Sequence, residues 1–181
     1  MKNSLKKMII ISILVSSFSL LFANGLENKN AIGVYIIGSE NAIGGIQYER
    51  HFSDLISEKF GLYAFYNNSS YSTTPFEFNL TAETDFKLYE TNWRNIVSSR
   101  LFVYAMMGYD IKKESQTYYV EDGDNEQEEK FLQNAIASLG FGFDFIFFDH
   151  LSIPLQFGFM ATFPDNPNIG FCGGTGIRYS W

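Results

Sequence analysis

The sequence predicts an all-β fold, an eight-stranded antiparallel up-and-down transmembrane β-barrel, and three observations lead to this prediction. Along residues 169–181, large apolar side chains mostly alternate with glycine, cysteine, serine and arginine, which is the period-two pattern of a strand with two unlike faces. Aromatic residues make up 18% of the 181 residues, yet the mean hydropathy is close to zero. A barrel reconciles the last two facts, because only alternate residues of its strands face lipid.

The N-terminal residues 1–23 have the pattern of a secretory signal peptide. Lys2, Lys6 and Lys7 precede an apolar run from Met8 to Ala23 that serines interrupt. The run is shorter than the ~20 apolar residues of a spanning helix. We therefore expect cleavage after Ala23, with residues 24–181 forming the barrel, and an uncleaved anchor helix is the alternative.

Polar turn residues divide the first half of the barrel domain into four strands. We predict strands at 31–38, 42–50, 55–67 and 76–89, separated by clusters of Ser, Asn, Asp and Pro. The fourth strand alternates clearly, with Phe76, Phe78 and Leu80 opposite Glu77 and Asn79. The second and third alternate less well, because Arg50 and Glu58 fall on the apolar side beside a short turn.

The second half contains four more strands, which we predict at 96–111, 131–147, 151–163 and 169–181. The sixth and seventh carry rows of Phe and Leu on one face and Gly, Ser and Gln on the other. An even number of strands places both chain ends on one side. The second, fourth and sixth connections are short, whereas the third and fifth are long, which matches the short inner turns and longer outer loops of membrane barrels.

The apolar face is expected to point outward. An eight-stranded barrel has room inside only for side chains or one small ligand, and the rows of Phe and Leu would overfill it. In hydrocarbon, each large apolar side chain contributes ~1.5–3 kcal/mol, and barrel closure pairs every backbone group. The alternative is a soluble periplasmic barrel that carries lipid.

The closing strand ends on Trp181, with Ile177 and Tyr179 on the same face. This ending resembles the C-terminal assembly signal of bacterial outer-membrane barrels. The chain from residue 31 onward resembles the small eight-stranded members of that group: the OmpA transmembrane domain, OmpX and OmpW-like proteins. The resemblance implies a location in the bacterial outer membrane, contact with outer-membrane lipid, and recognition by the barrel-assembly machinery.

Charged residues on the inward face gather toward the end with the short turns. A lone charge in a narrow lumen is costly to desolvate. We therefore predict a salt-bridge network that plugs the lumen, as in OmpA-type barrels, and a gate or narrow ion path is the alternative. Turn positions predict Asp85 opposite Arg100, and Gln47 opposite Lys59 with Glu49 diagonal to it. The network comprises Glu49, Lys59, Asp85, Lys87, Arg100, Asp144 and Arg178.

The longest connection, 112–130, is predicted to be an acidic surface loop. It contains Glu114, Glu121, Asp122, Asp124, Glu126, Glu128 and Glu129. Residues 122–125 hint at a calcium loop but lack the EF-hand spacing. We expect a solvated loop that meets an extracellular partner, with divalent-cation binding as the alternative.

Other functions find little support in the sequence. With 13 basic and 20 acidic residues, net −7, the chain is unsuited to binding nucleic acid. Cys172 is the single cysteine, so no disulfide forms within the chain. His51 and His150 fall in predicted periplasmic turns, without metal-ligand spacing or a nucleophile elbow. We therefore predict no enzyme, no catalytic or metal-binding residues and no cofactor.

The favoured function is a structural or surface-interaction role for an outer-membrane barrel with a plugged lumen. One alternative is a narrow porin-like or OmpW-like channel for small or apolar molecules. The other is the soluble periplasmic lipid carrier.

Overall fold

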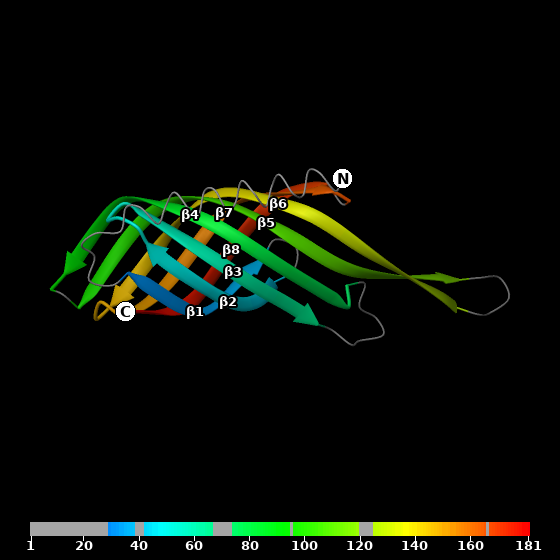
Figure 1. Cartoon of the computed structure of the whole chain (residues 1–181), viewed down its shortest axis with the longest axis horizontal. Coiled ribbons are helices and arrows are strands. Elements are labelled where there is room, and N and C mark those ends of the chain that lie inside the picture. The colour runs from blue at the N-terminus through cyan, green and yellow to red at the C-terminus, as the bar shows by residue number, and fades with distance from the viewer. Residues whose placement is uncertain (1–28, 39–41, 67–73, 95, 120–124, 166) are drawn as a thin grey trace.

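The computed structural model describes residues 29–38, 42–66, 74–94, 96–119, 125–165 and 167–181. These residues form a closed barrel in which each strand pairs antiparallel with its neighbours in sequence, and β1 pairs with β8 (Figure 1). This arrangement confirms the predicted fold class. The same residues contain no helix long and apolar enough to cross a membrane. The strands are β1 (Asn30–Gly38), β2 (Ala42–His51), β3 (Ile56–Tyr66), β4 (Phe76–Trp93), β5 (Val97–Tyr119), β6 (Asn125–Phe147), β7 (Leu151–Pro164) and β8 (Asn168–Ser180).

The barrel closes where the first and last strands meet. The register runs from Ala31 opposite Ser180 to Gly38 opposite Gly173. Two backbone hydrogen bonds extend this seam, from Trp181 N to Asn30 O at 2.9 Å and from Asn30 N to Trp181 O at 3.2 Å. Within the described barrel wall, closure gives every strand a paired neighbour on both sides, as strands in hydrocarbon require.

Most strand boundaries agree with the sequence prediction within one residue, but the fourth, fifth and sixth strands are longer than predicted. β4 continues to Trp93, and β5 and β6 pair with each other as far as Tyr119 opposite Asn125. Much of the predicted loop 112–130 is therefore a β-ladder, and the loop prediction was wrong there. The hydrogen bonds of a β-ladder join backbone groups, so two strands made of polar and charged residues can pair without an apolar face.

We call residues 114–130 the hairpin arm, because there β5 and β6 extend past the rest of the barrel (Figure 1). β4 pairs with β5 only as far as Phe76 opposite Lys113. β7 pairs with β6 only from Pro164 opposite Asn134. The side chains of 115–128 lie outside the described part of the structure, as do residues 120–124 and 1–28. The predicted signal peptide 1–23 therefore stays a prediction.

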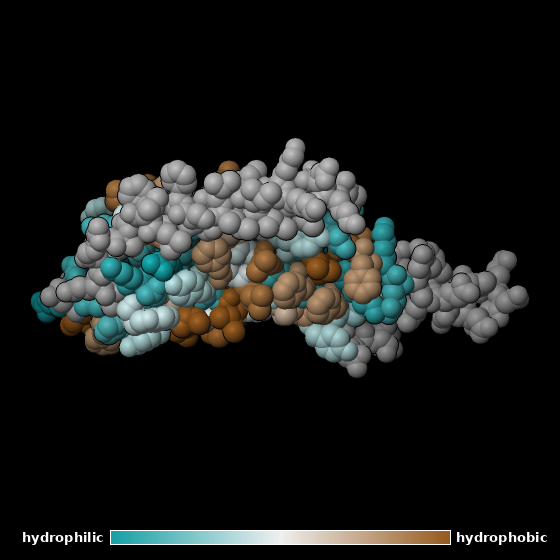
Figure 2. Space-filling view, in the orientation of Figure 1, coloured by the Kyte–Doolittle hydropathy of each residue, from teal (hydrophilic) through white to brown (hydrophobic). Residues whose placement is uncertain are grey.

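Large apolar side chains point outward, as expected. Val34 is 64% exposed, Leu139 68% and Phe159 65%, whereas Lys59 and Arg178 are each 1% exposed. Apolar residues accordingly gather on the visible side of the barrel (Figure 2). An exposed apolar surface of this extent fits contact with lipid.

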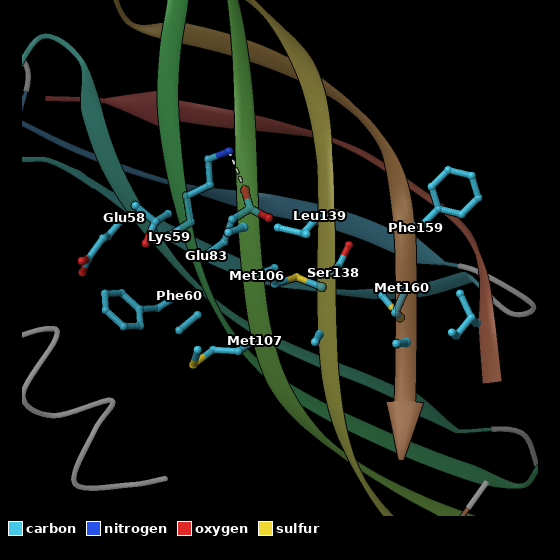
Figure 3. Close-up of a pocket in the computed structure, with 16 residues that line it drawn as sticks. Glu58, Lys59, Phe60, Glu83, Met106, Met107, Ser138, Leu139, Phe159 and Met160 are labelled. Atoms are coloured by element: carbon cyan, nitrogen blue, oxygen red, sulfur yellow. Dashed lines mark hydrogen bonds and ion pairs between the residues drawn. The ribbon is translucent and has the colours of Figure 1, made fainter. Parts of the chain in front are cut away.

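Alanines hollow one part of the outer surface. Ala82, Ala105, Ala137 and Ala161 lie on neighbouring strands β4 to β7 and line a groove of about 530 Å³. Bulky side chains, among them Phe60, Met107, Leu139 and Phe159, surround the groove (Figure 3). The lipid-facing surface is therefore uneven rather than uniformly bulky.

Candidate functional site

The lumen is the candidate functional site, because charged and polar side chains from seven of the eight strands, β2 to β8, are buried there. Alternation directs every second residue inward, so residues distant in sequence meet across the barrel. Buried polar side chains on the inward face include Gln47, Glu49, Ser57, Lys59, Glu77, Asn79, Thr81, Glu83, Asp85, Asp110, Asn134, Ser138, Asp144, Gln156 and Arg178.

Arg178 of β8 is the centre of one ion-pair group. Its Nη1 lies 2.6 Å from Glu49 Oε2, and its Nη2 lies 2.7 Å from Asp144 Oδ2. The guanidinium also donates from Nε to Ser152 Oγ and from Nη1 to Gln47 Oε1, both at 3.3 Å. The planar fork of arginine lets a single side chain join β2, β6 and β7 to β8.

Lys59 of β3 is the centre of a second group. Its Nζ lies 2.9 Å from Glu83 Oε1, an ion pair drawn in Figure 3, and 2.5 Å from Asp85 Oδ2. The same ammonium lies 4.5 Å from the centre of the Phe102 ring. Two carboxylates and an aromatic face thus surround a lysine that is almost fully buried.

Gln156 connects the second group to the opposite wall of the barrel. Its Nε2 donates to Glu83 Oε1 at 2.5 Å, and its Oε1 accepts a hydrogen bond from the Tyr35 hydroxyl. On the other side, Glu49 Oε1 accepts from Ser57 Oγ at 2.8 Å. Side chains therefore connect across the lumen in several directions.

Two sequence-predicted pairs were wrong, because the strands pair in a different register. Lys59 stands opposite Glu49, not Gln47, since the β2–β3 turn is centred about one residue later than predicted. Asp85 stands opposite Tyr104, and Arg100 stands opposite Glu90. The prolonged β4 and a β-bulge between Lys87 and Tyr89 cause this second shift.

Lys87 and Arg100 consequently lie apart from the two buried groups. Lys87 Nζ is 2.5 Å from Glu90 Oε2, and Arg100 Nε is 4.0 Å from the same oxygen. Their side chains are 21% and 20% exposed. They line a polar vestibule of about 260 Å³ at the short-turn end of the lumen, together with His51.

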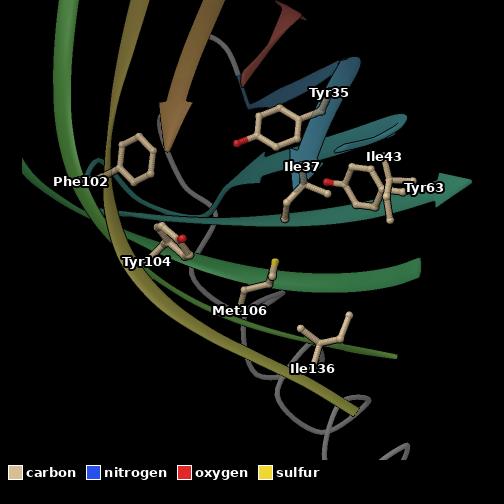
Figure 4. Close-up of a cluster of buried hydrophobic side chains, with 8 residues drawn as sticks. All are labelled: Tyr35, Ile37, Ile43, Tyr63, Phe102, Tyr104, Met106 and Ile136. Atoms are coloured by element: carbon tan, nitrogen blue, oxygen red, sulfur yellow. The ribbon is translucent and has the colours of Figure 1, made fainter. Parts of the chain in front are cut away.

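An aromatic and aliphatic cluster fills the lumen beyond the charges. Tyr35 and Tyr63 meet edge to face with ring centres 6.3 Å apart. The Tyr104 hydroxyl lies 3.4 Å from Ser138 Oγ and 3.7 Å from Cys172 Sγ, so the cysteine is part of the lumen wall. The cluster consists of Tyr35, Ile37, Ile43, Tyr63, Phe102, Tyr104, Met106 and Ile136 (Figure 4).

Sequence reasoning did not include Glu83, Gln156 and Tyr35 among the site residues. Their inward position follows from alternation, so the polar face of each strand contained the signal. Their place beside Lys59 depends on register and on the twist of the barrel, which alternation does not specify.

The C-terminal residues lie on the outside of the barrel. Ile177, Tyr179 and Trp181 are about half exposed, at 52%, 54% and 50%. His150 stacks on Tyr179 with ring centres 5.6 Å apart, and its Nδ1 lies 3.0 Å from Ser180 O. The aromatic end of β8 therefore lies at the short-turn side of the barrel.

Comparison with known proteins gives a match in structure alone. No family model and no curated protein matches the sequence. The N-terminal β-barrel domain of Pseudomonas aeruginosa OprF is similar, with a TM-score of 0.57 and 9% identity over 86% of this chain and 100% of that one. Outer membrane protein H (OprH) from P. aeruginosa is similar with a TM-score of 0.56 and 14% identity, over 84% of this chain and 99% of that one.

The fold is thus that of the small eight-stranded outer-membrane β-barrels. The predicted outer-membrane location agrees with these matches and with the apolar outer surface.

Proposed function

We propose that the protein is an outer-membrane barrel with a structural or surface-interaction role and a lumen closed to solutes. The observation that supports this most is the set of buried side chains that spans the lumen, from Arg178 with Glu49 and Asp144 to Lys59 with Glu83. The proposal includes no catalytic step and no cofactor.

The dimensions of the barrel support a closed lumen. Eight strands leave an interior wide enough only for side chains or one small ligand. The aromatic cluster of Figure 4 occupies the lumen next to the charges, with Tyr35, Tyr63 and Phe102 almost fully buried. A solute would have to displace both the aromatic cluster and the ion-paired side chains to cross the lumen.

The hairpin arm supports the surface-interaction role. It is a paired ribbon that begins at Glu114 opposite Lys130 and ends at Tyr119 opposite Asn125. It lies at the end of the barrel opposite the paired residues Asn30 and Trp181, which is the outer side in membrane barrels (Figure 1). An acidic ribbon there would favour a basic extracellular partner, and divalent-cation binding by residues 112–130 is the alternative. Outer-membrane lipid and the barrel-assembly machinery, recognising Ile177, Tyr179 and Trp181, complete the proposed partners.

Two experiments test the proposal. Purified protein in planar bilayers is expected to give no discrete conductance steps, and reproducible steps would instead support a narrow channel. Protease added to intact cells is expected to cut within residues 115–128. An uncut arm, or a protein that is soluble without detergent, would contradict the surface role and support the periplasmic carrier.

A further inference from the structure

A separate group of buried polar residues lies in the lumen at the end near the hairpin arm. Asn79 of β4 stands opposite Asp110 of β5, and Glu77 stands opposite Lys112 one pair further out. Glu77 is 3% exposed, Asn79 6% and Asp110 1%. None of these residues belongs to the Arg178 or Lys59 group.

Four of the five side-chain oxygens of Glu77, Asn79 and Asp110 lack a hydrogen-bond donor in good geometry. Glu77 Oε2, Asn79 Oδ1 and both Asp110 carboxylate oxygens are buried and have no donor in good hydrogen-bond geometry within the described part of the chain, although the Asn134 and Lys112 side chains face the Asp110 carboxylate. They are four of the eight such side-chain atoms in the described residues. Buried polar atoms in native proteins nearly always have a partner, so four unsatisfied oxygens at one place indicate a missing ligand.

This group contains one basic side chain, Lys112, and two acidic side chains, Glu77 and Asp110. Lys112 Nζ lies 3.4 Å from Glu77 Oε1 and 3.7 Å from Asp110 Oδ2, and Asn79 Nδ2 donates to Glu77 Oε1 at 3.4 Å. One ammonium therefore faces two carboxylates at distances too long for good hydrogen bonds to either. The Lys112 side chain is 23% exposed, so it has a path to solvent.

A small cavity adjoins these side chains. Its volume is about 30 Å³, and Glu77, Asn79, Asp110 and Lys112 line it together with apolar residues such as Ile37. A cavity of ~10–15 Å³ is enough for one water. There is thus room for an ion and a water molecule.

We propose that Glu77, Asn79 and Asp110 bind a divalent cation, Ca²⁺ in preference to Mg²⁺, at the outer mouth of the lumen. Calcium takes oxygen ligands from carboxylates, amide carbonyls and water in flexible geometry, whereas magnesium requires a near-ideal octahedron. The described residues contain no cluster of three or more His, Cys, Asp or Glu arranged to hold a metal. The site therefore depends on the Asn79 amide oxygen and on water to complete the coordination.

Lys112 is then a competitor of the metal. In the absence of the metal its ammonium partly neutralises the two carboxylates, and on binding it moves toward solvent. Removal of this lysine should strengthen metal binding, an outcome that a purely structural lysine–carboxylate pair does not predict.

Calorimetric titration of the full refolded protein in detergent micelles with CaCl₂ tests the proposal. The parent is expected to bind one Ca²⁺ that Asp110→Asn and Glu77→Gln bind about tenfold more weakly or not at all. Lys112→Gln is expected to bind Ca²⁺ severalfold more tightly than the parent. Heat-modifiable gel mobility verifies that each variant is folded, and Asn79→Ala replaces any variant that is not.

A hairpin-arm variant, Glu126→Gln with Glu128→Gln, is the matched control and is expected to keep the bound Ca²⁺. The proposal is overturned if the parent binds no Ca²⁺, or if Asp110→Asn binds it as tightly as the parent. Loss of binding in the arm variant alone also overturns it, because the ion would then belong to the arm. Neither result bears on conductance, so the closed lumen is tested independently.

Discussion

At the scale of single residues, the middle of the lumen depends on ion pairs between buried charges and on small residues beside the aromatic rings. Arg178 compensates two carboxylates from different strands. Gly140 and Gly158 stand opposite each other next to the Tyr104 ring. Both features occur where alternation directs the residue inward.

Replacement of Arg178 should destabilise the barrel strongly. Arg178→Met leaves Glu49 and Asp144 buried without their counter-charge, and loss of one partner from a buried pair typically costs ~3–5 kcal/mol. Equilibrium unfolding in urea with lipid vesicles measures the loss.

Arg100→Gln is the matched control for Arg178→Met. The Arg100 side chain is partly exposed, and its Nε lies as far as 4.0 Å from Glu90 Oε2. We therefore expect the free energy of unfolding to fall by less than ~1 kcal/mol. If Arg178→Met and Arg100→Gln lowered the free energy of unfolding equally, the buried ion pairs of Arg178 would stabilise the barrel no more than an exposed ion pair does.

Gly140→Ala should also impair folding. A β-carbon at this position would overlap the carbonyl oxygen of Phe157 and lie 2.7 Å from a carbon of the Tyr104 ring. At Gly170 a β-carbon would meet no atom within 4 Å. Gly170→Ala is therefore the control. We expect slower folding and a lower unfolding midpoint for Gly140→Ala but not for Gly170→Ala, and similar behaviour of these two variants would refute the steric argument.

At the scale of elements, β4, β5 and β6 differ most from the sequence expectation. A β-bulge between Lys87 and Tyr89 shifts the pairing of β4 with β5. β5 and β6 continue as a two-stranded ribbon after both have lost their outer neighbours. The barrel wall and the hairpin arm are therefore parts of the same strands with different surroundings.

Removal of the arm should leave the barrel intact. Residues 115–128 pair with neither β4 nor β7, so replacing them with a two-residue Asn-Gly turn removes no barrel hydrogen bond. Heat-modifiable mobility and the urea midpoint are expected to match the parent. A shortened protein that fails to refold would show that the arm is needed to close the barrel.

At the scale of the whole molecule, the orientation of the two faces determines what surrounds the barrel. Phe157 stacks near Phe141 and Phe171 on the outer surface, with ring centres 6.1 and 6.4 Å apart. On the opposite face of β7, Gln156 is 3% exposed and hydrogen-bonded in the lumen. At adjacent positions, β7 therefore presents an apolar side chain, Phe157, to the outer surface and a polar side chain, Gln156, to the lumen.

Phe157→Arg should prevent assembly in membranes. An arginine on the lipid face near mid-height costs ~2–4 kcal/mol. Folding yield into lipid vesicles is the measurement, and Phe157→Leu, which stays apolar, is expected to fold normally. If Phe157→Arg were folded and soluble without detergent, the sheet would have the opposite orientation.

Much of the fold could be predicted because its signals are local. Alternation along β7 and β8 assigns inward and outward faces without knowledge of any neighbour, and turn residues separate eight strands. The extent of β5 and β6 could not be predicted in this way, since the polar residues of the arm pair through their backbones.

The sequence by itself determined the number of strands, the face of each residue and hence a barrel with an apolar exterior and a polar lumen. Only the tertiary structure decided that Lys59 meets Glu83 and Asp85, that Arg100 lies apart from Asp85, and that Asn79 faces Asp110. The physical reason is that a face follows from a period of two along one chain, whereas a partner depends on register. Register responds to every turn length and bulge, and a change of turn length leaves the alternation within each strand unaltered.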